Sequence, residues 1–322
     1  MTLKVQNIGD DITLIDLFDL GLENRTGAYV LHEKELTIIE TSASPSVPYL
    51  LKGLESLGID PKDVKNIIVT HIHLDHSGGV GLFLEHCPKA KVFVHPRGKR
   101  HLQDPSRLIA SAKTVYGEEQ FQKLFDPILP VPEDQLVVKE DLETLQVGDD
   151  RVLTFYHTPG HANHHFCIHD SKSNGIFTGD TIGVFYSMLL DSDLEFYLPS
   201  TSPNQFDPDK MLESCERIEA LNVSKIFFGH FGMSEHPEEV YKQLKYWLDI
   251  FVDQGKAVVK EHGSLPFEEK SKLLSDRLYS TLQDYLKKKH ISEDHQVHEY
   301  LKIDMGICAQ GIIDYLQKAE NR

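Results

Sequence analysis

The chain lacks the features on which secreted and membrane-spanning proteins depend. Its 322 residues include only four cysteines, which show no paired spacing: Cys87, Cys167, Cys215 and Cys308. A disulfide framework is therefore not expected, and the cysteines are interpreted as buried free thiols. No apolar run approaches the roughly 18 to 20 residues that cross a bilayer, and the first six residues lack the apolar region of a signal peptide. We therefore expect a cytoplasmic protein that does not enter a membrane.

Positive charge is scarce as well. The chain has 33 lysines and arginines against 50 aspartates and glutamates, which gives a formal net charge of -17. Such a surface repels polyanions, so nucleic acid is not an expected partner. We expect a small-molecule substrate instead, and the sequence leaves open whether the chain forms a homodimer.

Short apolar runs and helical patterns alternate along the first two thirds of the chain. They form two comparable sets, and the β-like runs lie at 28–32, 36–39, 64–69, 92–95, 151–156, 165–169, 175–178 and 225–228. Helical spacing follows at 46–57 and at about 208–221, where Asp207-Pro208 supplies a cap and a first turn. Strands that recur between helices in this way predict a layered α/β protein.

The last seventy or so residues have a different pattern. Apolar residues recur there at helical spacing in successive helical segments. Lys287-Lys288-Lys289 ends the middle one, where the helix dipole favours positive charge. We predict one domain over residues 1–250 and a helical extension over 251–322. The extension is interpreted as a cap on the core in preference to a substrate lid or a dimer surface, because apolar stripes usually serve packing.

A dense group of metal-binding side chains follows the apolar run 66–69. The heptad from Thr70 to His76 holds His71, His73, Asp75 and His76 directly after this strand-like segment. In extended backbone His71 and His73 face the same side, and a turn then directs Asp75 and His76 toward a second point. Imidazole and carboxylate ligands without thiolate favour zinc, iron or manganese over a structural cysteine-type zinc site.

Three more strand-like runs end in the same way, with a glycine turn and then a possible ligand. His161 follows His157-Thr158-Pro159-Gly160, Asp180 follows Gly179, and His230 follows Gly229. Ligands at strand ends can converge at one edge of a sheet stack.

The seven candidates sort into two metal positions: His71, His73 and His161 for one, and Asp75, His76 and His230 for the other, with Asp180 as a bridge. Two cations about 3.5 to 4 Å apart can share a hydroxide near neutral pH and polarise a carbonyl or phosphoryl oxygen. Asp75 can also orient the nucleophilic water, which makes it the candidate catalytic residue. The predicted reaction is hydrolysis.

The sequence resembles the metallo-β-lactamase superfamily. The motifs THIHLDH, TPGH, TGD and FFGH occur in family order over about residues 12 to 235, and longer stretches resemble a little-characterised group with archaeal and thermophilic members. The resemblance implies an αββα sandwich, here with a helical C-terminal extension, and two divalent metal ions per chain. Zinc is the first expectation, with iron or manganese as alternatives.

The resemblance also bears on the kind of enzyme. Where this chain has Glu40, many members carry an aspartate that braces the ligand loop, here residues 70–76, by hydrogen bonds. Glu40 is therefore expected either to keep that role with its longer side chain or to alter the hydrogen bonds. His73 stands where flavodiiron proteins have Glu, which disfavours a di-iron reductase. Glyoxalase II is similar in its ligand cluster and in its helical C-terminal part. Quorum-quenching lactonases place a tyrosine after the bridging aspartate, and Tyr186 is loosely comparable.

Several residues are candidates for substrate contact. The segment 95–101 is a basic island in which Arg97 and Arg100 could receive a carboxylate or phosphate, although charge runs are usually solvated. His164 and His165 follow His161 and could donate to an oxyanion, brace a ligand or pack as ordinary strand or loop residues. The stretch 191–207 has no clear periodicity and is a candidate lid.

The leading hypothesis is therefore a dinuclear metal hydrolase in which a metal-bridging hydroxide cleaves a small ester, thioester or lactone. Its alternatives are a phosphodiesterase and a metal-containing sensor or binding protein of low turnover. The sequence names neither the substrate nor the native metal.

Overall fold

The computed structural model describes residues 3–320, which divide into two compact units. Unit 1 contains residues 3–157, 164–179 and 223–236, and unit 2 contains residues 158–163, 180–222 and 237–320. Both units are assembled from segments that are separate in the sequence. The predicted boundary between residues 250 and 251 lies inside helix α8 (Pro237–His262), and the predicted division into domains stays a prediction.

Unit 1 contains a seven-stranded sheet in which the strands follow chain order. These strands are β1 (Val5–Asn7), β2 (Ile12–Asp16), β3 (Gly27–Leu31), β4 (Thr37–Ile39), β5 (Asn66–Ile68), β6 (Lys91–Val94) and β7 (Leu136–Val138). The strands from β1 to β4 pair antiparallel, whereas β4, β5, β6 and β7 pair parallel. The parallel strands require crossover connections, which explains why helices occupy the segments between them.

A six-stranded sheet forms the second layer of unit 1. Its order is β15-β14-β11-β10-β9-β8, with β8 (Thr144–Gln146), β9 (Val152–His157), β10 (Phe166–Asp170), β11 (Gly175–Phe177), β14 (Lys225–Phe227) and β15 (Met233–Ser234). Strands β11 and β14 pair parallel, and the other neighbours pair antiparallel. The strand ends that carry candidate ligands therefore belong to two different sheets.

The two-residue period of the strands separates two apolar cores. In β2, Leu14 joins the core between the two sheets, whereas its neighbour Ile15 joins the core on the opposite face. Tyr29 and Val30 of β3 are divided in the same way. Both faces of the first sheet are consequently buried, which accounts for the continuous apolar runs in its sequence.

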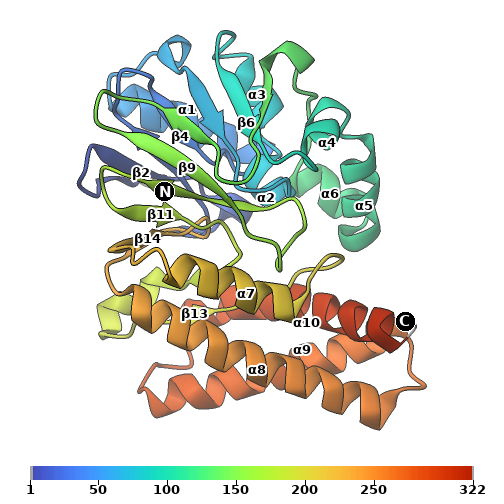
Figure 1. The fold of residues 1–322 in the computed structure, drawn as a ribbon. Helices are drawn as coiled ribbons and strands as arrows, with labels where there is room; N and C mark the ends of the chain where they lie inside the picture. Colours follow the sequence, from blue (N-terminus) through green and yellow to red (C-terminus); the bar gives the residue numbers. More distant parts are fainter. Residues whose placement is uncertain (1–2, 321–322) are drawn as a thin grey trace. The chain divides into compact units, whose positions relative to one another are not determined.

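Helices cover the outer face of the first sheet (Figure 1). They are α1 (Val47–Ser56), α3 (Val80–Leu84) and α4 (Lys99–Gln103). The buried apolar residues of α2 (Leu74–Ser77), α5 (Ser106–Tyr116) and α6 (Glu118–Leu124) form a separate cluster. The outer core receives Leu50 from α1, Phe83 from α3 and Leu102 from α4. Unit 1 thus supplies one helical layer and two sheet layers of the expected sandwich.

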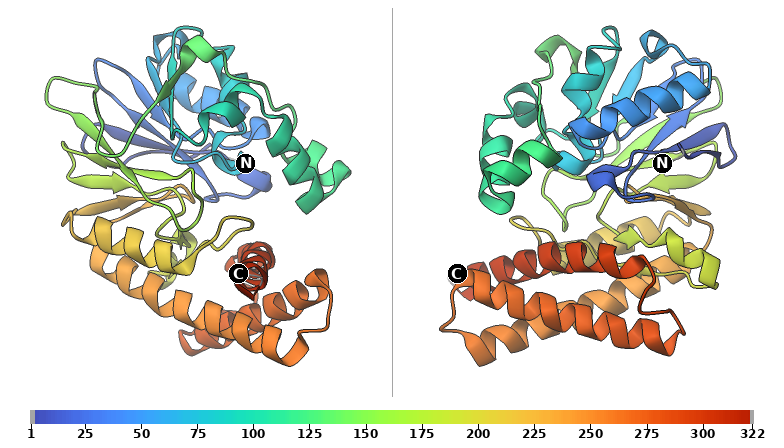
Figure 2. Two further views of the ribbon diagram at one scale, coloured as in Figure 1. Left: turned by 45° about the vertical axis from the view of Figure 1, so that its right-hand side comes forward. Right: turned by 180° about the vertical axis from the view of Figure 1, so that it is seen from behind.

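Unit 2 is mainly helical. It contains α7 (Pro208–Glu219), α8, α9 (Phe267–Lys288), α10 (Val297–Glu320) and the strand pair β12 (Val184–Phe185) and β13 (Tyr197–Leu198). Helices α8, α9 and α10 pack side by side, as the views in Figure 2 show. The expected mixed α/β fold with a helical C-terminal region is confirmed. No helix within residues 3–320 has the length and apolar character that would let it cross a membrane.

The sequence patterns found most elements but shortened some of them. Helix α10 begins at Val297, well before the helical spacing of Cys308, Ile312 and Leu316 that marks it in the sequence. The elements that were not predicted include strands β1, β2, β7, β8, β12, β13 and β15 and two helices, 106–116 and 118–124. The candidate lid at 191–207 is partly a core segment, because Phe196, Tyr197 and Leu198 are almost fully buried. All four cysteines are free and buried, as the sequence predicts.

A buried ion pair in unit 1 gives a test of this fold. The guanidinium Nε of Arg151 lies 3.1 Å from Asp170 Oδ1, and neither side chain is exposed to solvent. Replacing Arg151 by leucine leaves Asp170 as an uncompensated buried charge, so we expect the free energy of unfolding to fall by about 3–5 kcal/mol. Urea denaturation of Arg151→Leu measures this. Lys99→Ala, which breaks the exposed pair with Glu133, is the control and is expected to change stability by less than about 1 kcal/mol.

Candidate metal centre

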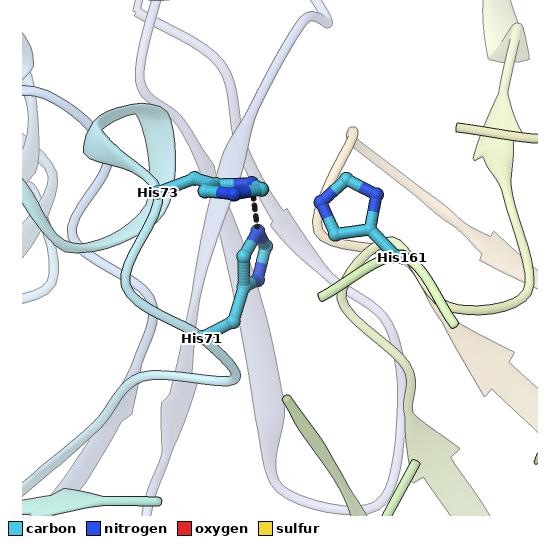
Figure 3. A group of neighbouring side chains, drawn as sticks. All are labelled: His71, His73 and His161. Carbon is cyan, nitrogen blue, oxygen red and sulfur yellow. Dashed lines mark hydrogen bonds between the residues drawn. The ribbon is translucent and has the colours of Figure 1, made fainter. Parts of the chain in front are cut away.

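The ligand loop begins where strand β5 ends and the backbone turns into the short helix α2. His71 and His73 precede the helix, and their rings approach each other, with Nε2 of His71 lying 3.1 Å from Nδ1 of His73 (Figure 3). Two nitrogens that bind one zinc ion at 2.0–2.1 Å lie about 3.3 Å apart in a tetrahedral site. The spacing of this histidine pair therefore suits a shared metal ion. Figure 3 also draws His161, the third ligand predicted for this position.

A second group of donors lies within unit 1. Asp75 and His76 belong to the first turn of α2, and His230 follows strand β14. Oδ2 of Asp75 lies 3.8 Å from Nε2 of His76 and 3.6 Å from Nε2 of His230. The two imidazoles are buried, whereas the Asp75 side chain is 31% exposed, so its carboxylate is the member of the group that solvent can reach.

Glu40 ties this second group to the end of strand β5. Its Oε1 accepts a hydrogen bond from the backbone N–H of Thr70 at 2.8 Å, and its Oε2 lies 2.9 Å from Nδ1 of His76. Because a carboxylate accepts hydrogen bonds, Nδ1 of His76 carries the proton and Nε2 presents its lone pair to a metal. The longer side chain of Glu40 thus makes both contacts expected of a brace, from a backbone with φ of 70°.

Thr70 orients the first histidine of the loop. Its Oγ1 lies 3.0 Å from Nδ1 of His71, and its carbonyl oxygen accepts the N–H of Phe166 in strand β10. The hydroxyl can accept the Nδ1 proton, which leaves Nε2 of His71 as the ligand atom. The ligand loop is therefore connected to both sheets of unit 1 through one residue.

The turn that carries His230 is held by a buried tyrosine. The hydroxyl of Tyr29 lies 2.7 Å from the carbonyl oxygen of Phe228 and 2.8 Å from that of Gly232, on either side of His230. A Cβ added to Gly229 would come within 2.7 Å of the His76 ring, so this position requires glycine. Neither Tyr29 nor Thr70 was identified as a site residue from the sequence, because their contacts are formed by residues distant in the chain.

The remaining two predicted ligands belong to unit 2 and lie close together there. Nε2 of His161 is 3.6 Å from Oδ2 of Asp180, and both side chains are buried. Nδ1 of His161 donates to the carbonyl oxygen of Ser200 at 2.9 Å, so Nε2 again presents the lone pair. The hydroxyl of Ser200 donates to Asp180 Oδ2 at 3.0 Å.

These donors fit divalent metal ions of the zinc, iron or manganese type. Asp75, His76 and His230 each offer a ligand atom within 4.8 Å of the others. Hydrogen-bond acceptors fix the proton on Nδ1 of His76 and of His161, as is usual for histidines that bind metals. Imidazole and carboxylate donors without thiolate match the ligand preferences of these metals.

The predicted substrate contacts occupy different environments. His165 stacks on His71 with ring centroids 4.9 Å apart, and His164 lies edge-on to His73 at 5.4 Å. Arg97 and Arg100 are exposed in unit 1. Tyr186 is buried in unit 2, where its hydroxyl donates to Asp304 Oδ2 at 2.7 Å. The roles of all five residues in substrate binding stay predictions.

A buried acid that the sequence did not reveal lies near the second group. Asp19 is 2% exposed, and its Oδ2 is 3.5 Å from Nε of the equally buried Arg25. Burial raises the pKa of Asp19 to about 6; the charge of Arg25 opposes this shift, and that of Asp75 adds to it. No motif surrounds Asp19, so only the fold could bring it within electrostatic reach of Asp75.

Comparison with known proteins identifies the family. The model of the metallo-beta-lactamase superfamily matches residues 24–230, which is more than half of the chain. This match includes all seven candidate ligands. The chain therefore belongs to the metallo-beta-lactamase superfamily, as its motifs suggest.

Particular relatives refine this assignment. A metallo-beta-lactamase fold-containing protein of Sulfurisphaera tokodaii is 30% identical over 201 residues, covering 59% of this chain and 70% of the relative. An acyl-coenzyme A thioesterase of Gallus gallus is 27% identical over 181 residues, covering 52% of this chain and 56% of the relative. The chain thus spans little more than half the length of that thioesterase. Its relationships place it among the enzymes of the superfamily, which include hydrolases.

A solved structure shows the same fold over almost the whole chain. The crystal structure of a metallo-beta-lactamase family protein from Thermus thermophilus has a TM-score of 0.69 and 20% sequence identity. The superposition covers 98% of this chain and 95% of the Thermus chain, so the likeness extends to the C-terminal helices.

The brace at Glu40 predicts how metal affinity responds to mutation. In Glu40→Gln, an amide NH₂ replaces one of the two acceptor oxygens, and either Thr70 N–H or His76 Nδ1–H then faces a donor. We expect zinc affinity to fall by about 10- to 100-fold, measured by competition with a chromophoric chelator. The exposed residue Glu35 provides the matched control, Glu35→Gln, which is expected to leave the affinity unchanged. Wild-type affinity in Glu40→Gln would contradict the brace.

His95 predicts a pH dependence of stability that is separate from the ligands. Burial lowers the pKa of His95 to about 3, and its Nδ1 accepts the N–H of Arg97, which requires a neutral ring. Below pH 6.5 the His95 ring takes up a proton in the unfolded chain but stays neutral in the folded chain. The free energy of unfolding therefore falls as the pH falls. The expected loss from this residue is about 1–2 kcal/mol between pH 6.5 and 5. Urea unfolding of wild type and His95→Asn at both pH values measures it, and the variant should show a smaller loss; equal losses would argue against the shift.

Proposed function

We propose that this protein is a dinuclear metal hydrolase that cleaves a thioester of a phosphate-bearing thiol. The observation that carries the proposal is the pair of donor groups, one in each unit, in which hydrogen-bond acceptors hold the proton on Nδ1 of His76 and of His161 and leave Nε2 with its lone pair. Fixing the tautomer of a histidine in this way is costly for a side chain that only packs, whereas a metal centre requires it. The superfamily membership supports the same conclusion.

Chain connectivity supports joining the two donor groups into one centre. Asp180 follows Gly179 by one peptide bond, and in unit 1 a Cβ on Gly179 would lie 2.5 Å from Thr70 Oγ1. His161 belongs to the short segment 158–163, and both ends of this segment continue into unit 1. Short covalent connections therefore join both unit 2 ligands to segments of unit 1. In this proposal Asp180 would be one of the ligands that hold the two zinc ions.

The reaction assigns separate tasks to the residues of the chain. Two bound cations would supply a water ionised near neutral pH and would polarise the scissile carbonyl. Asp75, the exposed member of its group, orients the attacking water by accepting one of its hydrogen bonds. His164 and His165, beside His73 and His71, are the side chains available to stabilise the developing oxyanion.

The basic island supports the choice of a phosphate-bearing thiol. A Cβ on Gly98 would meet Ile72 Cγ2 at 2.8 Å, so the island packs directly beside the ligand loop within unit 1. Arg97 and Arg100 are exposed on this segment of an otherwise acidic chain. Guanidinium groups bind phosphate with two parallel hydrogen bonds, which suits the phosphates of a coenzyme A-type thiol. The thioesterase relative acts on such a substrate by its name.

A lactone hydrolase is the alternative that a specific residue favours. Tyr186 follows the candidate bridging residue Asp180 at a spacing loosely comparable to that in lactonases. Its hydroxyl is, however, hydrogen-bonded to buried Asp304, which makes it a weaker candidate than the exposed arginines.

A substrate panel tests the proposal. Acyl-coenzyme A thioesters, phosphate-free thioesters of the same acyl groups, lactones and phosphodiesters are compared with zinc-loaded wild type, His71→Ala and Asp180→Asn. We expect the coenzyme A thioesters to be hydrolysed best and both variants to lose at least about 100-fold in kcat/KM. The exposed residue Asp149 provides the control Asp149→Asn, which should retain full activity.

The arginines separate substrate class from metal chemistry in the same panel. Arg97→Ala and Arg100→Ala should raise KM for coenzyme A thioesters about tenfold and leave phosphate-free thioesters unaffected, with Lys62→Ala as an exposed control. Full activity in Asp180→Asn would overturn the two-metal mechanism. Faster cleavage of lactones or phosphodiesters than of thioesters would overturn the substrate assignment.

A further inference from the structure

The segment that contacts both unit 2 ligands is itself fastened to the C-terminal helix. Ser200 accepts the His161 Nδ1–H through its carbonyl oxygen and donates its hydroxyl proton to Asp180 Oδ2. Its neighbour Thr201 is fully buried and donates its hydroxyl proton to the carbonyl oxygen of Cys308 in α10 at 2.9 Å. The thiol of Cys308 is directed at the carbonyl oxygen of Pro199 at 3.6 Å.

Helix α10 presents one continuous face to this segment. Asp304, Cys308 and Gly311 are spaced by four and three residues, so they lie on the same side of the helix. Asp304 accepts the hydroxyl proton of Tyr186, and Lys318, two turns after Gly311 on this face, donates to the carbonyl oxygen of Asn204 at 2.7 Å. The helix therefore holds the chain between Tyr186 and Asn204 at several points along its length.

Gly311 sets how closely the helix and the segment approach. A Cβ at this position would lie 1.7 Å from the carbonyl oxygen of Thr201 and 2.6 Å from the carbonyl carbon of Ser202. Both contacts are backbone atoms, which cannot rotate away as a side chain can. Any larger residue at 311 must push the Ser200–Thr201 backbone away from α10, and the hydrogen-bond partners of His161 and Asp180 would move with it.

From these contacts we infer that Ser200 is a positioning residue for the metal centre and that helix α10 fixes its place through Thr201, Cys308 and Gly311. The inference rests on the proposed function, because it takes His161 and Asp180 as metal ligands. It extends the metal centre's supporting structure to a helix that lies beyond residues 24–230, where the family model matches. The C-terminal helices thereby gain a role in metal binding in addition to packing.

The role of Ser200 gives the first half of the test. Ser200→Ala removes the hydroxyl that donates to Asp180, whereas Ser200→Thr retains one. Each full-length protein is stripped with a chelator and titrated with cobalt(II), and both the dissociation constants and the visible absorption spectrum are recorded. We expect Ser200→Ala to weaken at least one cobalt site by about 10-fold or more and to alter the spectrum, and Ser200→Thr to restore both toward wild type.

Two glycines of the same helix give the second half. Gly311→Ala is expected to weaken cobalt binding and change the spectrum in the same direction as Ser200→Ala. Gly306→Ala is the matched control, because a Cβ at Gly306 meets no atom within 4 Å, and it should bind cobalt as wild type does. Circular dichroism confirms that each variant is folded. If Gly311→Ala does not fold, the Ser200 pair decides the outcome.

The results distinguish this inference from the function on which it rests. Wild-type protein that holds less than one equivalent of cobalt or zinc would overturn both the metal centre and the role of Ser200. Two equivalents in wild type, with unchanged affinity and spectrum in Ser200→Ala, would overturn the inference and leave the proposed function standing. If Gly306→Ala lost as much cobalt affinity as Gly311→Ala, helix α10 would act only through general stability. That result would also overturn the inference.

Discussion

The structure of the ligand loop depends on one buried carboxylate. Glu40 is 2% exposed and accepts hydrogen bonds from the Thr70 backbone and from His76 at the same time. The first contact fixes the point where strand β5 becomes the ligand loop, and the second fixes which nitrogen of His76 is available. Its own backbone has a φ of 70°, a conformation that costs a non-glycine residue of order 1 kcal/mol or more. The surrounding strands β4 and β5, which are fully buried, hold that conformation in place.

The same principle recurs around the other candidate ligands. His71, His76 and His161 each place one ring nitrogen near an oxygen, which belongs respectively to Thr70, Glu40 and Ser200. The Glu40 carboxylate and the Ser200 carbonyl oxygen can only accept, so they determine the tautomers of His76 and His161, and the Thr70 hydroxyl can accept the Nδ1 proton of His71. The ligand motifs are local, but the residues that orient them come from two strand ends of the first sheet in unit 1 and from the segment that follows β13 in unit 2.

Much of the fold was predictable because the strands are buried on both faces. The apolar runs at 66–69 and 225–228 identify strands β5 and β14, although each strand ends one residue earlier. Strand β2 was missed even though all its residues are buried, since the polar residues Thr13 and Asp16 interrupt its apolar run. The sequence of segment 191–207 indicates irregular structure because it shows no clear periodicity. It is ordered by contacts with α8 and α10, such as the hydrogen bond from Gln243 to the carbonyl oxygen of Glu195.

The sequence by itself determined the family and the candidate ligands, because these residues sit in short motifs whose spacing is set by a single turn of backbone. Only the tertiary structure decided what supports them. Tyr29 lies about 200 residues from the turn it holds, and Thr201 lies 107 residues from Cys308. Hydrogen bonds between residues so far apart produce no periodic pattern in the sequence. Neither partner can be recognised before the fold brings the two together.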